Sequence, residues 1–177
     1  SFSWEDMTAR DTSELANDFG NLASRITAMI EKYCEGSIPK PANGGELEIL
    51  LANTVANADK AMCALDFQGG ILEIMNFCKR INLYVTETEP WTLAKDPANQ
   101  DKLLEVLYNT AEGVRALAVL LHSVMPEACE KLWESLGADK SLGPISEQLI
   151  GNVAKWGTLP EGSKVSKSAP LFPRLED

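Results

Sequence analysis

Three polar side chains recur at one spacing near the start of the chain. Asn17, Asn21 and Arg25 stand four residues apart, in a segment whose apolar residues repeat with helical period. At about 100° per residue, this spacing places the three in one column, roughly 130° away from the apolar stripe. Amide and guanidinium groups in a row can pair with the donors and acceptors on the edge of an unpaired base. The same column also fits an ordinary solvated helix face.

A second candidate is the tryptophan that follows a proline in YVTETEPWTLAKD, residues 84–96. Pro90 ends the preceding helix and is tolerated in the first turn of the next one. Trp91, in that turn, needs a partner, because an indole ring is costly to leave in water. It either plugs the end of the protein's own core or forms a platform on which an unstacked base can lie. Periodicity does not decide between the two.

Groups typical of catalysis or metal binding are sparse. The single histidine, His122, has no serine or cysteine at a spacing typical of a nucleophile, so we interpret it as a surface or packed residue. The cysteines are scattered without a CxxC pair, which favours free buried thiols in a reducing cytoplasm over a zinc site. They are Cys34, Cys63, Cys78 and Cys129. The acidic residues are interpreted as solvated helix faces. We predict no catalytic residue, metal or cofactor in this chain.

The elements that position the candidates are predicted to be helices. The first begins at Thr12, and Gly36 is its stop signal. The others cover 45–66, the run from Gly69 to Pro90, 97–123, and a short segment from Pro126. The apolar stripe of the first helix consists of Leu15, Phe19, Leu22, Ile26, Met29, Ile30 and Tyr33. No strand pattern is visible.

The composition fits one soluble domain with an extended tail. The chain has 177 residues, 45% hydrophobic and 24% charged, and no run of about 18 apolar residues. We therefore predict an all-α helix bundle over residues 12–157 and no membrane span. Residues 158–177 are rich in proline, glycine and serine and carry Leu171, Phe172 and Leu175, so we expect a C-terminal strap that packs back on the core.

The net charge of −10 restricts the kind of nucleic-acid contact that is possible. It disfavours a protein that grips nucleic acid through many phosphates. A protein that reads a few unpaired bases by stacking and hydrogen bonding stays compatible with it.

Several segments together resemble one family. SELANDFGNLASRITAMIEKYCEGSIPKP is similar to the opening helix of the anticodon-binding domain of methionyl-tRNA synthetases, and INLYVTETEPWTLAKD and PLFPRLE resemble later segments of that domain. SFSWEDM resembles the connection from the catalytic domain, so residues 1–11 are expected to be a connector. These matches cover nearly the whole chain in the right order. Asp11 and Thr12 depart from the family pattern, which has an aromatic residue and an asparagine there.

The resemblance implies roles for particular residues. Trp91 would stack on an anticodon base, with Pro90 positioning it. Asn21 and Arg25 would hydrogen-bond the first base of the CAU anticodon, with Asn17 as a neighbour. The implied partners are the anticodon loop of methionine tRNA and the catalytic domain of the parent chain. The parent would be a cytoplasmic ligase that uses ATP to join methionine to its tRNA, and this chain alone would be inactive.

Two points remain: the meaning of one short segment, and a second hypothesis for the function. Residues 164–168, KVSKS, resemble the KMSKS loop with which class I synthetases hold ATP, but no Rossmann pattern accompanies them, so we treat the match as chance. The other functional hypothesis is an acidic helical module that binds a basic protein, with Trp91 in the core. Two observations discriminate between the functions: whether Trp91 is exposed, and whether it lies beside Asn21 and Arg25 in one concave site.

Overall fold

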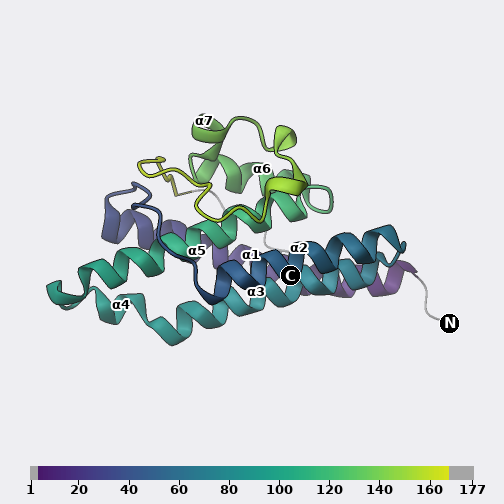
Figure 1. Cartoon of the computed structure of the whole chain (residues 1–177), viewed down its shortest axis with the longest axis horizontal. Coiled ribbons are helices and arrows are strands. Elements are labelled where there is room, and N and C mark those ends of the chain that lie inside the picture. The colour runs from purple at the N-terminus through teal and green to yellow at the C-terminus, as the bar shows by residue number, and fades with distance from the viewer. Residues whose placement is uncertain (1–3, 168–177) are drawn as a thin grey trace, which may run out of the picture.

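Four long helices form the body of the molecule (Figure 1). The structure is a computed structural model that describes residues 4–167, with side chains from Ser13 onward. The long helices are α1 (Trp4–Cys34), α2 (Glu46–Cys63), α3 (Phe67–Thr88) and α5 (Gln100–Leu121). Helix α3 packs against the other three. Within residues 4–167 the only β-type pairing is an isolated bridge between Ser37 and Lys164. The fold is therefore all-α, as predicted.

Shorter elements connect and cover this body. The short helix α4 (Pro90–Leu93) and the 3-10 turn η1 (Pro97–Asn99) link α3 to α5. Helices α6 (Pro126–Ser135) and α7 (Ala138–Leu142) follow, with the 3-10 turns η2 (Ile145–Glu147) and η3 (Ile150–Asn152). Helix α6 packs against α5 and α7. These later elements form a second layer along one side of α5 (Figure 1).

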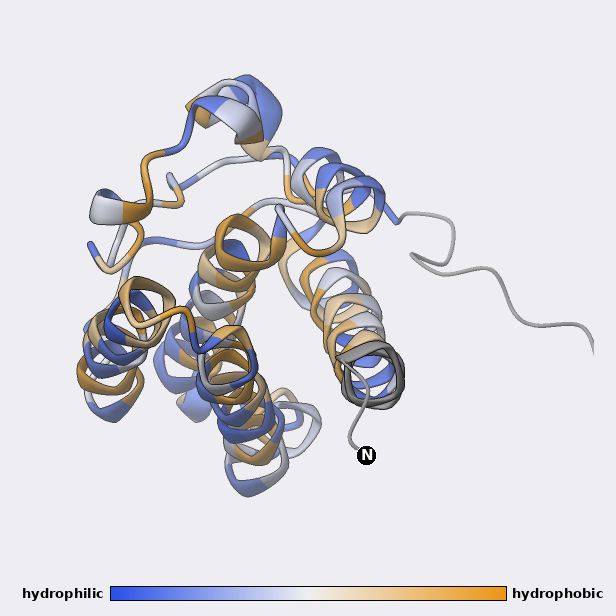
Figure 2. Ribbon diagram, turned by 90° about the vertical axis from the view of Figure 1, so that its right-hand side faces the viewer, coloured by the Kyte–Doolittle hydropathy of each residue, from blue (hydrophilic) through white to orange (hydrophobic). Residues whose placement is uncertain are grey.

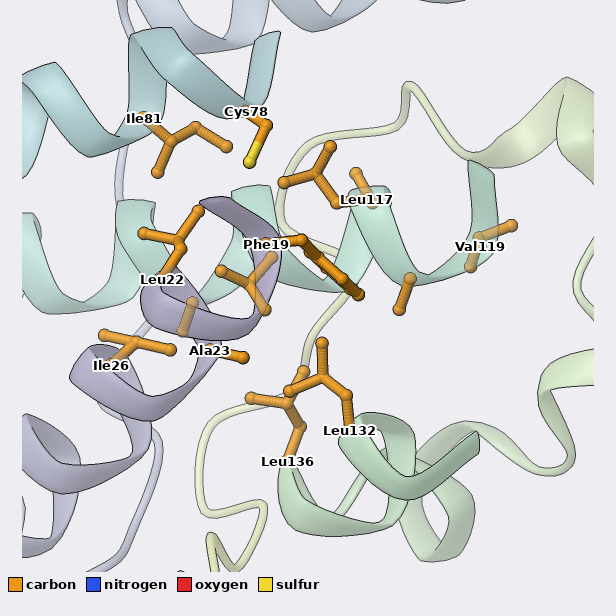
Figure 3. Packing of buried hydrophobic residues seen from close by; sticks show 14 of the residues in the cluster. Phe19, Leu22, Ala23, Ile26, Cys78, Ile81, Leu117, Val119, Leu132 and Leu136 are labelled. Atoms are coloured by element: carbon orange, nitrogen blue, oxygen red, sulfur yellow. The ribbon is translucent and has the colours of Figure 1, made fainter. Parts of the chain in front are cut away.

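Helix α5 runs through the centre because both layers cover it. Every residue from Val106 to Leu121 is buried, whereas a helix at a protein surface buries one face only. The stripe predicted on α1 contributes Phe19, Leu22 and Ile26 to the core. Figure 3 shows Phe19 in the middle of this cluster, between Leu117 of α5 and Leu132 of α6. Hydrophobic and hydrophilic residues alternate along the ribbons of the bundle helices (Figure 2).

The helix boundaries differ from the sequence prediction at three starts, one of which is α5, which begins at Gln100 because residues 97–99 form the 3-10 turn η1. Helix α1 begins at Trp4 rather than at Thr12, so most of the expected connector 1–11 is helical. Its sequence from Trp4 to Thr12 contains no glycine or proline that would interrupt a helix. Helix α3 begins at Phe67 rather than at the glycine pair, because the Asp66 side chain accepts a hydrogen bond from Gly69 N at 2.9 Å. An aspartate cap thus sets the start.

The chain after the helices lies along the loop that follows α1. Gly162 N donates to Ile38 O at 2.8 Å, Ile38 N donates to Ser163 O at 3.0 Å, and Val165 N donates to Gly36 O at 2.7 Å. The side chains of Leu159 and Val165 are buried. The described part of the KVSKS segment thus makes structural contacts. Leu171, Phe172 and Leu175, which we expected on the core, lie outside the described residues.

The cysteines and the histidine have simple surroundings. All four thiols are free. Cys78 and Cys129 are buried and Cys34 is half-buried, but Cys63 is exposed, so the prediction of buried thiols is wrong there. Cys63 is the last residue of α2, and it lies in a stretch, residues 62–67, that is exposed throughout. His122 Nε2 lies 3.3 Å from Glu130 Oε1. None of the helices in the described range is long and apolar enough to cross a membrane.

Candidate functional site

An open cleft of about 450 Å³ lies between α1 and α3, on the side of α1 away from its apolar stripe. Asn21 and Arg25, two of the predicted residues, contribute to its wall. The complete lining consists of Asp18, Asn21, Ser24, Arg25, Lys79 and Asn82. All six side chains are polar, so the cleft offers hydrogen-bond donors and acceptors and two cations. It is suited to a polar, planar group such as a base edge.

The local sequence of α1 explains why this wall is polar. Leu22, Ala23 and Ile26 are buried in the core, while Asn21 and Ser24 are exposed and Arg25 is half-buried. Because successive residues are rotated by about 100°, one stretch of α1 places its apolar side chains in the core and its polar side chains in the cleft wall. Asn17 is also exposed, as its place in the column predicts, but it does not line the cleft.

The second wall comes from α3 and was not predicted from the sequence. Lys79 Nζ donates to Glu14 Oε1 of α1 at 2.8 Å. Asn82 Nδ2 points to two backbone oxygens, Asp18 O at 3.4 Å and Cys78 O at 3.5 Å. Lys79 and Asn82 are three residues apart and so lie on one face of α3. The only sequence signal was the INLY segment, which contains Asn82.

Trp91 lies near the same end of α3 as Asn82. Asn82 is six residues, about 9 Å, from the last residue of the helix. Glu89 then adopts a left-handed conformation with φ 47°, and Pro90 opens α4 in a buried position. The amides of Thr92 and Leu93 both donate to Glu89 O, which fixes the turn that carries the tryptophan.

The indole of Trp91 is 39% exposed. The hypothesis that this residue belongs to the core is therefore wrong, and its exposure agrees with the platform interpretation. Trp91 does not line the cleft between α1 and α3. The break at Glu89 places it on a separate element, so the structure groups Asn21 with Arg25 and leaves Trp91 on α4 as a second exposed feature.

The charges of the cleft differ from those of the whole molecule. Arg25 and Lys79 bring two cations to its edge, although the chain carries a net charge of −10. The hydrogen bond to Glu14 raises the pKa of Lys79, and the neighbouring carboxylates act in the same direction. The ammonium group is therefore charged at neutral pH. Asp18 adds one carboxylate to the lining.

A larger depression, of about 610 Å³, lies between α5 and the segment that contains η2 and η3. Its lining includes Arg115, Gln148 and Lys155 but none of the predicted site residues. Arg115 there is committed to partners, because its Nη2 donates to Val153 O at 2.9 Å and its Nε pairs with Glu112. Among the described residues no group of three or more His, Cys, Asp or Glu side chains is placed to hold a metal ion.

Residues 46–153 match the family model described as the anticodon-binding domain of tRNA ligase. The chain belongs to that family. The matched range includes α3 with Lys79 and Asn82 and α4 with Trp91, while the α1 wall of the cleft precedes it.

Relatives with established names agree with this assignment. The methionine–tRNA ligase of Streptomyces coelicolor is 51% identical over 184 residues, which cover 100% of this chain and 34% of that protein. The methionine–tRNA ligase of Caldanaerobacter subterraneus is 40% identical over 99% of this chain and 27% of its own length. The chain thus spans between about a quarter and a third of the length of these relatives.

Solved structures give the same result for the fold. Mycobacterium tuberculosis methionyl-tRNA synthetase in complex with methionyl-adenylate superposes with a TM-score of 0.77 at 28% identity. The match covers 98% of this chain and 34% of that one. The apo form of the same enzyme gives a TM-score of 0.75 at 27% identity.

Proposed function

We propose that this chain is the anticodon-reading part of a methionine–tRNA ligase. The observation that carries the proposal is the polar cleft that contains both Asn21 and Arg25, in a chain of the anticodon-binding family. The names of the relatives supply the amino acid, and the resemblance of NLASR supplies the first base of the CAU anticodon as the target.

The chemistry of each side chain suggests a different role in RNA binding. A cytosine presents an amino donor and two acceptors on its pairing edge, which match the oxygen of an amide and the donors of a guanidinium. Asn21 and Arg25 would supply these groups from one wall of the cleft. Trp91 would stack on a base of the anticodon, and Pro90 would hold it in the first turn of α4. Asn17, one turn before Asn21 on the same column, would be a neighbour of this base contact.

The catalytic work belongs to the parent enzyme. We infer that the other two thirds of that enzyme bind methionine and ATP, form the adenylate and transfer methionine to the tRNA. The M. tuberculosis relative was solved with methionyl-adenylate, which supports ATP as the parent's cosubstrate. The parent is expected to work in the cytoplasm, with this chain and the catalytic part as partners on one tRNA.

Binding of an anticodon stem-loop RNA tests the proposal. A methionine-tRNA stem-loop with CAU should bind this chain more tightly than the same RNA with a changed first anticodon base. Asn21→Ala and Arg25→Ala should each remove most of that difference, which for one base edge is worth about 1–3 kcal/mol. Asn53→Ala, an exposed asparagine on α2, is the matched control and should keep the full preference. Equal binding of both RNAs by the unaltered chain would refute the proposal.

A further inference from the structure

The α3 wall of the cleft contains a cation that base recognition does not use. Lys79 lies opposite Asn21 and Arg25, and its side chain is 49% exposed. A lysine ammonium is a compact point charge, which suits a phosphate oxygen better than the planar edge of a base. Any base that enters the cleft brings its own phosphodiester groups to the rim. The rim cation is therefore placed where an RNA backbone would pass.

In the free domain this cation is held by α1. Lys79 Nζ lies 2.8 Å from Glu14 Oε1, and Asp18, one turn further along α1, lines the cleft below it. Both members of the pair are about half exposed, with side-chain exposures of 49% and 51%. An exposed ion pair of this kind is weak, because water screens it and two long side chains must be ordered. The lysine can therefore exchange its carboxylate partner for a phosphate at little cost.

We infer that Lys79 binds a backbone phosphate of the RNA loop in the cleft, and that Glu14 competes with that phosphate for the ammonium group. The inference rests on the proposed function, since the phosphate belongs to the RNA whose base the cleft reads. It adds two residues with opposite effects. Lys79 would strengthen binding regardless of the anticodon sequence, and Glu14 would weaken it.

The competition also fits the charge of the protein. An acidic chain repels RNA at long range, so a few local cations must carry the phosphate contacts. Within the cleft lining there are two cations, and Arg25 is assigned to the base edge. Lys79 is the one that remains. A carboxylate that neutralises it in the free state lowers the affinity for any RNA and leaves discrimination to Asn21 and Arg25.

The test is the salt dependence of stem-loop binding. Each phosphate contact contributes about 0.7–0.9 to the slope of log K against log salt concentration. Lys79→Gln should weaken binding of the CAU stem-loop at low salt and make that slope shallower by about one contact. Lys140→Gln, which removes the same charge from exposed Lys140 on α7, is the matched control and should leave the slope nearly unchanged.

Substitution of Glu14 should have the opposite effect on RNA binding. Glu14→Gln should tighten binding at low salt, whereas Glu127→Gln on α6 should not do so beyond the general effect of one fewer negative charge. In the Lys79→Gln background the gain from Glu14→Gln should disappear, because the two changes act on one contact. Circular dichroism melts of each variant check that the fold is kept.

The outcomes separate this inference from the proposed function. A Lys79→Gln slope equal to that of the unaltered chain, or a Glu14→Gln gain that persists without Lys79, overturns the inference. The anticodon preference of the unaltered chain and its loss in Arg25→Ala would still stand in that case. If the unaltered chain shows no anticodon preference at all, the proposed function fails instead. An effect of Lys79→Gln that differs between CAU and altered anticodons would also contradict a phosphate contact.

Discussion

Glu112, in the middle of the central helix α5, accepts a hydrogen bond from the backbone N–H of Leu159 at 3.0 Å. The same carboxylate accepts from Tyr108 Oη at 2.8 Å and pairs with Arg115. The Arg115 guanidinium in turn donates to Val153 O at 2.9 Å. Glu112 and Arg115 are 0% and 2% exposed. A fully buried ionic group on α5 thus fixes the backbone of the segment that follows the last 3-10 turn.

Replacing the acid of this group should destabilise the domain strongly. Glu112→Gln keeps the size and the acceptor oxygen but leaves the Arg115 guanidinium buried without its counter-charge. Breaking a buried pair in this way costs about 3–5 kcal/mol. The free energy of unfolding, measured by urea denaturation, should fall by that amount. Glu105→Gln, which breaks the exposed pair with Lys102 on the same helix, should cost less than about 1 kcal/mol. Similar losses for both variants would contradict a special role of the buried pair.

Replacing Trp91 should impair charging of tRNA more than folding. In the ligase that we propose as the parent, Trp91→Ala should lower kcat/KM for the cognate tRNA by roughly ten- to a hundredfold, since one lost stack is worth about 1–3 kcal/mol. Methionine activation, followed by ATP–pyrophosphate exchange, should stay unchanged.

A buried tryptophan provides the matched control for that change. Trp133 is 2% exposed and its Nε1 donates to Gly143 O at 2.8 Å. Trp133→Ala should cost about 3–5 kcal/mol of stability, whereas Trp91→Ala, which removes a side chain that is only partly covered, should lower the melting temperature clearly less. A Trp91→Ala protein as unstable as Trp133→Ala would remove the evidence for a binding role.

Truncation of the strap should lower thermal stability. A chain that stops after Gly162 loses the buried side chain of Val165 and two backbone hydrogen bonds, from Val165 N to Gly36 O and from Ile38 N to Ser163 O. Together these contribute about 3 kcal/mol, which corresponds to roughly 6–12 °C in melting temperature for a domain of this size. A chain that stops after Lys167 keeps these contacts and should melt close to the full chain. If it instead melts as low as the shorter chain, the stabilising contacts belong to residues beyond 167.

The thiols should differ in reactivity and make stability depend on alkaline pH. Cys63, exposed at the end of α2, should be alkylated rapidly at neutral pH, as mass spectrometry can show.

Burial raises the pKa of Cys78, and likewise that of Cys129, from 9.0 to about 12. Above pH 9 the unfolded chain therefore releases thiol protons that the folded chain keeps, so the free energy of unfolding should fall between pH 9 and about 12. Urea denaturation across this range measures it, and a flat profile would contradict buried neutral thiols.

The sequence alone predicted the elements that have long, regular patterns. The α1 stripe is in the core, and the column with Asn21 and Arg25 faces the cleft, because a helix of 31 residues repeats its period many times. Helix α7 and the turns η2 and η3 have three to five residues each, too few to show a period. They were not predicted.

The residues that were not predicted owe their roles to the packing of helices against one another. Glu112 was interpreted with the other acidic residues as part of a solvated face, since nothing in the local sequence shows that α5 is covered on all sides. Lys79 and Asn82 were not candidates because only the packing of α3 beside α1 brings them opposite Asn21. The spacing of residues predicts which of them share one face of a helix. It does not predict which helix packs against that face, or in which register.

The C-terminal strap contacts residues that are far away in the sequence, and this affects how the protein folds during its synthesis. Lys167 N donates to Glu31 Oε1 at 2.7 Å, a pair separated by 136 positions. Gly137 lies directly beneath the strap, where an added Cβ would come within 2.5 Å of Lys164 O. On a ribosome that emits the chain from its N-terminus, α1 to α6 emerge well before the residues that cover them. The nascent bundle must therefore wait with Gly36, Ile38 and Gly137 uncovered until residues 162–167 have emerged, and docking of this segment is the step that covers them.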